Sequence, residues 1–311
     1  MLKYTVGLIG LGNIGMGYDY DIPNSESIFT HANAFSLHSN FELVGGCDPD
    51  INKRKRFEKR YSQTFSSVSQ LIQAENPEIF VVSSPTKTHD QVIKEIIEIG
   101  QPKLILCEKP LTSSYKKSKL INNLCKASKV PIILNFPRRA EIGIKKIKQM
   151  ILSEKLIPPF KVNIFYSKGL MHNGIHFVDL LSYFFGEIKA SRVIKSGHNE
   201  KNIDISLEYD ISSANLISWN EEFYENYSME LLSPSGKIIY GNDSSIEFKS
   251  VNKDKSRLNL KGIHIENNSQ IYQLNVVEEI LLFMKNSKTK LTTGDEFLSY
   301  QRVIDNLLKH N

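Results

Sequence analysis

The chain has 311 residues, enough for two domains, and its 41% hydrophobic and 23% charged composition is that of an ordinary globular protein. No apolar run approaches the roughly 18 residues that span a bilayer, so we expect no membrane segment or membrane partner. The net charge of +5 is spread over lysines interleaved with Glu and Asp, which favours a solvated surface over a nucleic-acid patch.

Cysteine usage predicts the compartment. Cys47, Cys107 and Cys125 are odd in number and lie in or beside apolar segments, which suits reduced thiols better than a disulfide framework. The apolar stretch at residues 1–10 runs directly into a glycine loop without a small-residue cleavage site, so we interpret it as a buried strand. Both features predict a cytoplasmic protein.

Residues 1–135 alternate short β-type runs with helical patterns, which predicts an α/β fold with a doubly wound parallel sheet. Each strand is a nearly unbroken apolar run, as expected when helices cover both faces of the sheet. The expected strands are residues 5–9, 41–47, 79–83, 104–107 and 131–135, with a helix over 91–99. This segment is predicted to be an N-terminal Rossmann domain.

After residue 135 the rhythm changes to consecutive strands without helices between them, which indicates a mostly antiparallel, open-faced sheet. The expected helices are residues 139–153, 174–185, 269–285 and 295–309. The expected strands are residues 160–167, 191–196, 203–209, 214–219, 227–232 and 237–240. Residues 136–311 are therefore predicted to form an α+β domain for substrate binding and oligomerisation.

A glycine motif, Gly10-Leu11-Gly12-Asn13-Ile14-Gly15, follows the first predicted strand directly. In the dinucleotide fingerprint G-x-G-x-x-G the first glycine permits a tight turn and the second lets the backbone approach the pyrophosphate. The third lets helix and strand pack closely, and the helix N-terminus faces the phosphates. The motif is weak alone, but its position at the end of the first strand predicts a nicotinamide-dinucleotide site.

Asp48 ends the second predicted strand, where a carboxylate can accept hydrogen bonds from the adenosine ribose and favour NAD. Lys53 and Arg54 follow closely and could bind a 2′-phosphate, so NADP stays open. Asp48 lies further from Gly15 than the usual spacing of about 20 residues. We attribute the additional residues between Gly15 and Asp48 to a loop at residues 16–30. This loop is either part of the rim of the substrate site or a structural surface loop.

Several further motifs in a fixed order give the chain a recognisable resemblance. It resembles the glucose–fructose oxidoreductase and inositol dehydrogenase family (Gfo/Idh/MocA), across the cofactor domain and on to about residue 186. The matching segments, besides the glycine motif, are Cys47-Asp48-Pro49-Asp50, Ser84-Pro85-Thr86-Lys87-Thr88-His89, Glu108-Lys109-Pro110 and Gly174-Ile175-His176-Phe177-Val178-Asp179.

This resemblance implies that Lys109 lies beside the nicotinamide and contacts the reacting oxygen, with Glu108 in the same cofactor site. A fixed ammonium there could stabilise an alkoxide as it forms. Pro110 is expected to hold a rigid turn, which can be cis.

The resemblance also implies that Ser84, Pro85 and Thr86 form a loop along the cofactor. His89 is expected to start the next helix at this cofactor site, where we favour a packing or capping role over a catalytic one.

His176 is the candidate general acid and base, because the resemblance places a histidine or tyrosine here against the substrate hydroxyl, and imidazole titrates near neutral pH. A hydrogen-bonded core histidine is the alternative. Many family members carry an aspartate four residues earlier, where this chain has His172, followed by Asn173. The two histidines share a helix face if the helix extends that far. Either proton transfer is arranged differently, or the protein is a weakened or noncatalytic member.

In addition to Asn173, three further residues are predicted to bind substrate. Asp179 could compensate for the missing aspartate, although capping or packing explains it equally well. Arg138 and Arg139, at the domain junction, could bind a carboxylate or phosphate, or form salt bridges between domains. We expect no metal site, because His172 and His176 lack an evident third ligand.

The predicted function is hydride transfer between a nicotinamide and a secondary alcohol or ketone of a sugar, sugar derivative or polyol. Similarity alone favours a nucleotide-linked sugar. The alternatives are a reductase of an imine or unsaturated ring, and a noncatalytic protein that senses the dinucleotide. Because relatives often dimerise through the open sheet face, we expect a homo-oligomer, either a dimer or a tetramer.

Overall fold

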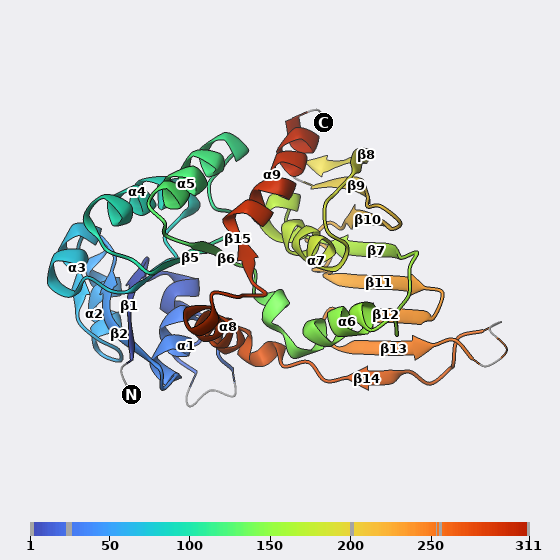
Figure 1. Ribbon diagram of the computed structural model, residues 1–311, viewed down its shortest axis with the longest axis horizontal. Coiled ribbons are helices and arrows are strands. Elements are labelled where there is room, and N and C mark those ends of the chain that lie inside the picture. The colour runs from blue at the N-terminus through green and yellow to red at the C-terminus, as the bar shows by residue number, and fades with distance from the viewer. Residues whose placement is uncertain (1–2, 23–26, 200–201, 253, 255–256, 310–311) are drawn as a thin grey trace. The chain divides into compact units, whose positions relative to one another are not determined.

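A computed structural model of the chain describes residues 3–22, 27–199, 202–252, 254 and 257–309 (Figure 1). The chain divides into two compact units. The first comprises Met1–Ala140 and Gln270–Leu298, and the second comprises Glu141–Ser269 and Ser299–Asn311. The division predicted after residue 135 therefore differs in two respects: the boundary lies after Ala140, and residues 270–298 pack with the first unit.

The first unit is built on a seven-stranded sheet within the described residues, parallel except for β15. In spatial order its strands are β15 (Thr292–Thr293), β6 (Ile132–Asn135), β5 (Leu104–Glu108), β4 (Ile79–Val82), β1 (Tyr4–Ile9), β2 (Phe41–Cys47) and β3 (Thr64–Phe65). The doubly wound parallel sheet is confirmed. Its strand order reverses between β1 and β4, and open α/β sheets bind ligands at such a point.

Helices form two groups in this unit, since α3, α4 and α5 contact one another and α1 contacts α8. Their bounds are α1 (His31–Leu37), α2 (Ile51–Glu58), α3 (Val68–Glu75), α4 (His89–Ile99), α5 (Tyr115–Ala127) and α8 (Tyr272–Asn286). The apolar face of α8, with Val276, Val277 and Ile280, joins the same buried cluster as Val6 and Leu104 from the sheet.

The second unit contains an eight-stranded, mostly antiparallel sheet, in which β7 and β10 form the parallel pair. In spatial order its strands are β14 (Ile263–Ile265), β13 (Ile246–Ser250), β12 (Gly236–Tyr240), β11 (Ser228–Ser233), β7 (Lys161–Tyr166), β10 (Ser213–Ser218), β9 (Asn202–Glu208) and β8 (Ala190–Asn199). The predicted antiparallel pattern is confirmed, and β13 and β14 extend it beyond the predicted strands.

One face of this sheet is covered and the other is open. Along β7, Val162, Ile164 and Tyr166 are buried while the residues between them are exposed, the alternation of a half-buried strand. The helices of the second unit include α6 (Ile142–Leu152) and α7 (Ile175–Phe185). Phe177 of α7 contacts the ring of Tyr240 in β12, so α7 packs on the buried face.

Two helix predictions shift in detail. The helix expected at 139–153 begins only at Ile142, because Pro137–Ala140 forms a separate 3₁₀ turn. The last helix, α9 (Gly294–Lys309), matches its predicted span but is divided between the two units after Leu298.

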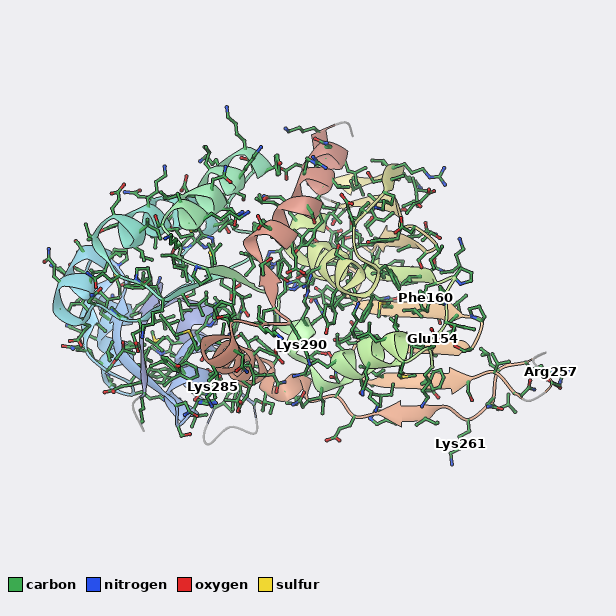
Figure 2. All side chains as sticks on the ribbon, in the orientation of Figure 1. Glu154, Phe160, Arg257, Lys261, Lys285 and Lys290 are labelled. Atoms are coloured by element: carbon green, nitrogen blue, oxygen red, sulfur yellow. The ribbon has the colours of Figure 1, made fainter. Side chains whose placement is uncertain are left out.

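Charged side chains of both units lie at the surface, among them Lys285 and Lys290 of the first and Glu154 and Lys261 of the second (Figure 2). Within the described residues, no helix combines the length and the apolar character needed to cross a bilayer.

Candidate functional site

The glycine motif forms a tight loop after β1. Gly10 has a φ of +96°, and a Cβ there would lie 2.4 Å from the backbone nitrogen of Ser84. A Cβ at Gly15 would lie 2.2 Å from the carbonyl oxygen of Gly10, whereas a Cβ at Gly12 would meet nothing within 4 Å. Packing therefore requires Gly10 and Gly15, while Gly12 borders open space, as the dinucleotide fingerprint requires of its second glycine.

The helix opened by the motif is shorter than expected. Asn13–Gly17 form a single π-helical turn, in which the Gly17 amide donates to the Gly12 carbonyl at 3.1 Å. The expected α-helix with its N-terminus at the phosphates is thus absent at this position, and α1 starts only at His31. Asn13 is exposed and Ile14 half-buried, so the loop backbone has to supply most of any phosphate contact.

The predicted loop at 16–30 is closed by a buried carboxylate. Asp19 is fully buried and accepts hydrogen bonds from the Phe29 amide (2.7 Å), the Thr30 hydroxyl (2.6 Å) and the Asn33 side chain (3.1 Å). Residues 23–26 lie outside the described chain. Asp19 therefore holds the two ends of the loop together, which gives the loop a structural anchor of its own.

Asp48 follows β2 and is 5% exposed. Its carboxylate accepts from the Leu11 amide at 2.9 Å, which ties it to the glycine loop, and Lys53 Nζ lies 3.5 Å away. Arg54 instead donates to the backbone carbonyls of Asp48 (2.8 Å) and Pro49 (2.9 Å). The predicted ribose ligand and the glycine loop are thus joined, and Nη1 of the Arg54 guanidinium is bound to backbone carbonyls.

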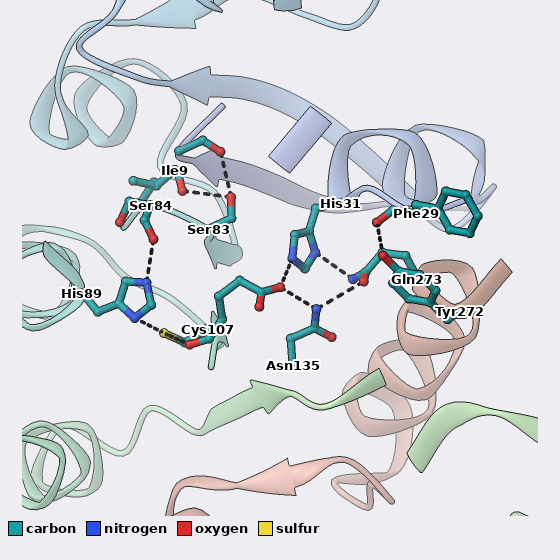
Figure 3. Close-up of polar contacts among 12 residues, drawn as sticks. Ile9, Phe29, His31, Ser83, Ser84, His89, Cys107, Asn135, Tyr272 and Gln273 are labelled. Carbon is teal, nitrogen blue, oxygen red and sulfur yellow. Dashed lines mark hydrogen bonds and ion pairs between the residues drawn. The ribbon is translucent and has the colours of Figure 1, made fainter. Parts of the chain in front are cut away.

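A second loop follows β4, across the switch point from the glycine loop. The Ser83 hydroxyl donates to the Gly10 carbonyl at 2.8 Å (Figure 3). The Thr88 hydroxyl lies 2.8 Å from Ser84 Oγ and 2.7 Å from the Pro85 carbonyl. Thr86 starts the 3₁₀ turn Thr86–Thr88. The predicted segment 84–86 therefore lies beside the glycine loop, with Ser83 as an anchor that sequence reasoning missed.

Lys109 directly follows β5, and its peptide bond to Pro110 is cis. The lysine is half-buried. Burial lowers the pKa of Lys109 below its usual value; the neighbouring Glu108 carboxylate opposes this effect, and the Arg138 guanidinium adds to it. Lys109 and Arg138 are therefore close enough to interact, which brings two predicted site residues together.

Glu108 contacts a polar network whose members His31, Asn135 and Gln273 are labelled in Figure 3. Its Oε1 accepts from His31 Nε2 at 2.9 Å and from the Asn135 amide at 2.6 Å. The Gln273 amide nitrogen lies 2.8 Å from His31 Nδ1, and its oxygen lies 3.2 Å from the Asn135 amide. Because an amide nitrogen only donates, Nδ1 of His31 accepts in this network and Nε2 donates to Glu108.

These hydrogen bonds decide the charge of Glu108. Burial raises the pKa of Glu108, but the hydrogen bonds from His31 and Asn135 outweigh it, and the Lys109 charge acts in the same direction. The pKa therefore lies below its ordinary value and Glu108 is a carboxylate. Its assignment as a cofactor ligand stays a prediction, because the contacts in the structure serve the protein interior.

His89 starts α4, as predicted, and is 1% exposed. Its ring contacts backbone carbonyls after β4 and β5. This geometry agrees with the packing role that the sequence favoured, and a direct cofactor contact stays a prediction.

The paired arginines have different surroundings. Arg139 is 1% exposed and forms an ion pair with Glu296 at 3.1 Å, inside the first unit. Arg138 is half-buried. The two residues therefore do not present a common bidentate surface, and Arg138 is the better candidate for a substrate contact.

In the second unit the predicted site residues surround the start of α7. His176 lies in the first turn of α7 and is half-buried, whereas His172 is exposed and belongs to a π-helical turn, Leu170–Gly174. The helical segment extends back to Leu170, but as a π-helical turn before α7, so a shared face for the two histidines stays a prediction. The Asn173 side chain donates to Tyr227 Oη at 3.1 Å, and Tyr227 donates to Glu225 at 2.7 Å.

Asp179 is fully buried and accepts from the Tyr300 hydroxyl at 2.9 Å. This is the packing role that the sequence left open, and a substrate contact by Asp179 stays a prediction. Among the described residues, no three His, Cys, Asp or Glu side chains gather as metal ligands would.

Sequence reasoning missed the partners of Glu108 and Asn173. His31 and Gln273 are separated by 242 positions, and Tyr227 lies 54 positions from Asn173. None of them belongs to a motif. A buried polar residue among apolar neighbours, such as Gln273 in α8, was the available signal.

Residues 4–136 match the model of an oxidoreductase family with an NAD-binding Rossmann fold, GFO_IDH_MocA. The matched segment coincides with the predicted Rossmann domain and covers less than half of the chain. The resemblance inferred from the motifs is thereby confirmed over the segment that carries the glycine loop, Asp48 and Lys109.

Curated relatives match more of the chain at low identity. Glucose-6-phosphate 3-dehydrogenase of Bacillus subtilis (strain 168) is 24% identical over 228 residues, which cover 66% of this chain and 59% of the relative. Myo-inositol 2-dehydrogenase of Thermotoga maritima is 23% identical over 258 residues, which cover 78% of this chain and 71% of the relative. The match thus spans less than two thirds of the first of these relatives.

Solved structures extend the likeness to the second unit. The WlbA dehydrogenase of Bordetella pertussis, in complex with NADH and UDP-GlcNAcA, has a TM-score of 0.74 at 16% identity, covering 99% of this chain and 95% of that chain. This likeness confirms the predicted fold class, a Rossmann sheet followed by a mostly antiparallel sheet.

Proposed function

We propose that this protein is an NAD-dependent oxidoreductase acting on a secondary alcohol or ketone of a sugar, sugar derivative or polyol. The observation that carries the proposal is the position of Lys109. Its half-buried ammonium follows β5 at the same edge of the sheet as the glycine loop and Asp48. A bound nicotinamide would exchange the hydride with the substrate carbon.

In this proposal Lys109 stabilises the substrate oxygen, because a fixed positive charge at that point favours the developing alkoxide. His176 takes and returns the hydroxyl proton, a role that rests on the family motif around it. Asn173 and Arg138 are proposed substrate ligands, since both are half-buried polar side chains. Arg139 and Asp179 are the weaker candidates for the substrate site, because each is buried in a pair with another residue of the protein.

The cofactor preference proposed is NAD. A 2′-phosphate would place further negative charge beside the Asp48 carboxylate, and Arg54 already binds backbone carbonyls. Lys53 is the cation available to offset that repulsion. Fluorescence titration should therefore give a Kd for NADH at least tenfold below that for NADPH. Equal or tighter binding of NADPH would contradict the preference.

Substrate class is the finer part of the proposal. A nucleotide-linked sugar is favoured by the likeness to a dehydrogenase solved with UDP-GlcNAcA, and the names of the curated relatives add a sugar phosphate and an inositol. The test is a panel of UDP-sugars, sugar phosphates, free sugars and inositols with NAD, read as NADH formation. We expect turnover with one of these classes.

Variants then separate the roles. Lys109→Met should lower kcat by about 10²–10³-fold, the loss typical of one oxyanion-stabilising donor. His176→Asn should lower it by about 10²-fold or more. Full turnover by His176→Asn would favour reduction of an imine or unsaturated ring instead. NADH binding without turnover across the panel would favour a dinucleotide-sensing protein.

Two coarser properties complete the proposal. We propose a cytoplasmic location, supported by three buried free cysteines. We also propose a homo-oligomer, a dimer or tetramer, formed through the open face of the second sheet. The substrate is the expected partner, and neither nucleic acid nor a membrane is part of the proposed function.

A further inference from the structure

His89 lies between the two backbone segments proposed to hold the nicotinamide and the lysine. Its Nε2 is 2.8 Å from the Ser84 carbonyl oxygen, at the start of the loop after β4. Its Nδ1 is 3.2 Å from the Pro110 carbonyl oxygen, in the turn after β5. The side chain is 1% exposed, so it contacts these segments from inside the protein. Figure 3 shows its contacts with Ser84 and Cys107.

We propose that His89 is a positioning residue: it holds the loop at 84–86 and the Lys109-Pro110 turn in register, and so sets the nicotinamide against the Lys109 ammonium. This inference rests on the proposed function. It assigns His89 no contact with cofactor or substrate.

The donors and acceptors around His89 indicate that its ring links the two segments by hydrogen bonds and does more than fill the space between them. Carbonyl oxygens only accept, so the imidazole must donate to Ser84 from Nε2. On the other side, Nδ1 faces the carbonyls of Pro110 and Leu111 at 3.2 Å and the Cys107 sulfur at 3.5 Å. That side is satisfied by a proton on Nδ1, or by donation from the Cys107 thiol to Nδ1. A proton on Nδ1 fastens the ring to the Pro110 turn, whereas donation from the thiol fastens it to Cys107 in β5, the strand that leads into that turn.

The hydrogen-bonded connection between these loops continues across the sheet. The Ser83 hydroxyl binds the Gly10 carbonyl, so the loop after β4 is fixed to the glycine loop on one side. His89 fixes the same loop to the turn after β5 on the other. Hydrogen bonds thus connect the carboxyl ends of β1, β4 and β5, which are neighbouring strands. Loss of His89 would release Lys109 from the cofactor loops while leaving the glycine loop and Asp48 intact.

The experiment compares two ligands in a His89→Phe variant, which fills the space without hydrogen-bonding. ADP-ribose contains the adenosine and pyrophosphate groups but lacks nicotinamide. We expect its Kd to stay within twofold of wild type, while the Kd of NADH rises at least fivefold and kcat falls at least 20-fold. His89→Gln, which restores one donor, should recover part of the kcat. His38→Phe is the matched control, because His38 is a buried histidine of the same unit that pairs with Glu278. In this variant the ratio of the Kd for NADH to the Kd for ADP-ribose should equal that of wild type.

Two results would overturn the inference. Equal weakening of ADP-ribose and NADH would show that His89 only supports packing, and unchanged NADH binding and kcat would show no role at all. If His89→Phe does not fold, the affinities of His89→Gln for NADH and ADP-ribose are compared with those of wild type instead, and the same two results would overturn the inference. A wild-type protein that binds NADH but turns over no substrate would defeat the proposed function, whereas the ratio of the two affinities would still test His89.

Discussion

At the scale of single residues, the site depends on how a half-buried lysine keeps its proton. Burial lowers the pKa of Lys109, and the Glu108 carboxylate next to it opposes that effect. Glu108 in turn is held as a carboxylate by His31 and Asn135. The hydrogen bonds around Glu108 therefore help to keep Lys109 protonated. This matters because an ammonium that loses its proton cannot stabilise an alkoxide.

Glu108→Gln tests this coupling. Without the carboxylate the pKa of Lys109 falls further, so the ammonium is lost at a lower pH as the pH rises. The alkaline limb of the kcat/KM profile should consequently move to lower pH. Glu278→Gln, which removes a surface carboxylate paired with His38, should leave the profile in place. An unmoved limb in Glu108→Gln would mean that Lys109 does not act as an ammonium.

At the scale of the element, the glycine loop separates a folding requirement from a binding requirement. A Cβ at Gly15 would overlap the Gly10 carbonyl, whereas a Cβ at Gly12 would meet open space. Gly12 has a φ of −83°, which alanine adopts without strain. The two glycines should therefore respond differently to the same substitution.

Gly12→Ala should leave the Tm within about 2 °C of wild type, since about 0.5 kcal/mol or less is at stake for a substitution that meets no neighbour. Its affinity for NADH should fall at least tenfold, because the methyl group takes the space of the pyrophosphate. Gly15→Ala should lower both Tm and affinity. Thermal melts and fluorescence titration measure the two effects. Undiminished NADH binding by Gly12→Ala would place the pyrophosphate elsewhere.

The sequence predicted elements well where one physical signal dominates. Strands buried on both faces, such as β4 and β5, are continuous apolar runs and were located to within a residue at each end. The π-helical turn at Asn13–Gly17 was not predictable, because the motif is also typical of a regular helix and the loop that follows interrupts it. The Glu108 network was missed because its members come from four separate elements.

At the scale of the whole molecule, sequence order and packing diverge. Helix α8 was predicted, but its amphipathic pattern does not say which core it joins, and Val276, Val277 and Ile280 pack in the first unit. Gln273 of this helix then completes the Glu108 network. A segment almost 140 positions beyond Asn135 is thus part of the proposed cofactor domain.

The open sheet face gives a prediction about assembly. Phe165 of β7 and Leu232 of β11 are 39% and 43% exposed on that face. If the face joins protomers, Phe165→Glu should convert the oligomer to a monomer by placing an unpaired charge in the interface. Light scattering after size-exclusion chromatography measures the mass, and Leu120→Glu, at another exposed apolar position, is the control. A monomeric wild type would refute the proposed assembly.

The most direct test of the central claim is a crystal structure of the protein with NADH and a ketone substrate or analogue identified by the panel. The nicotinamide should lie at the carboxyl edge of the first sheet, with Lys109 Nζ about 2.6–3.2 Å from the substrate oxygen and His176 within the same reach. A structure in which Lys109 lies beyond even a water-bridged contact with that oxygen would contradict the proposed mechanism.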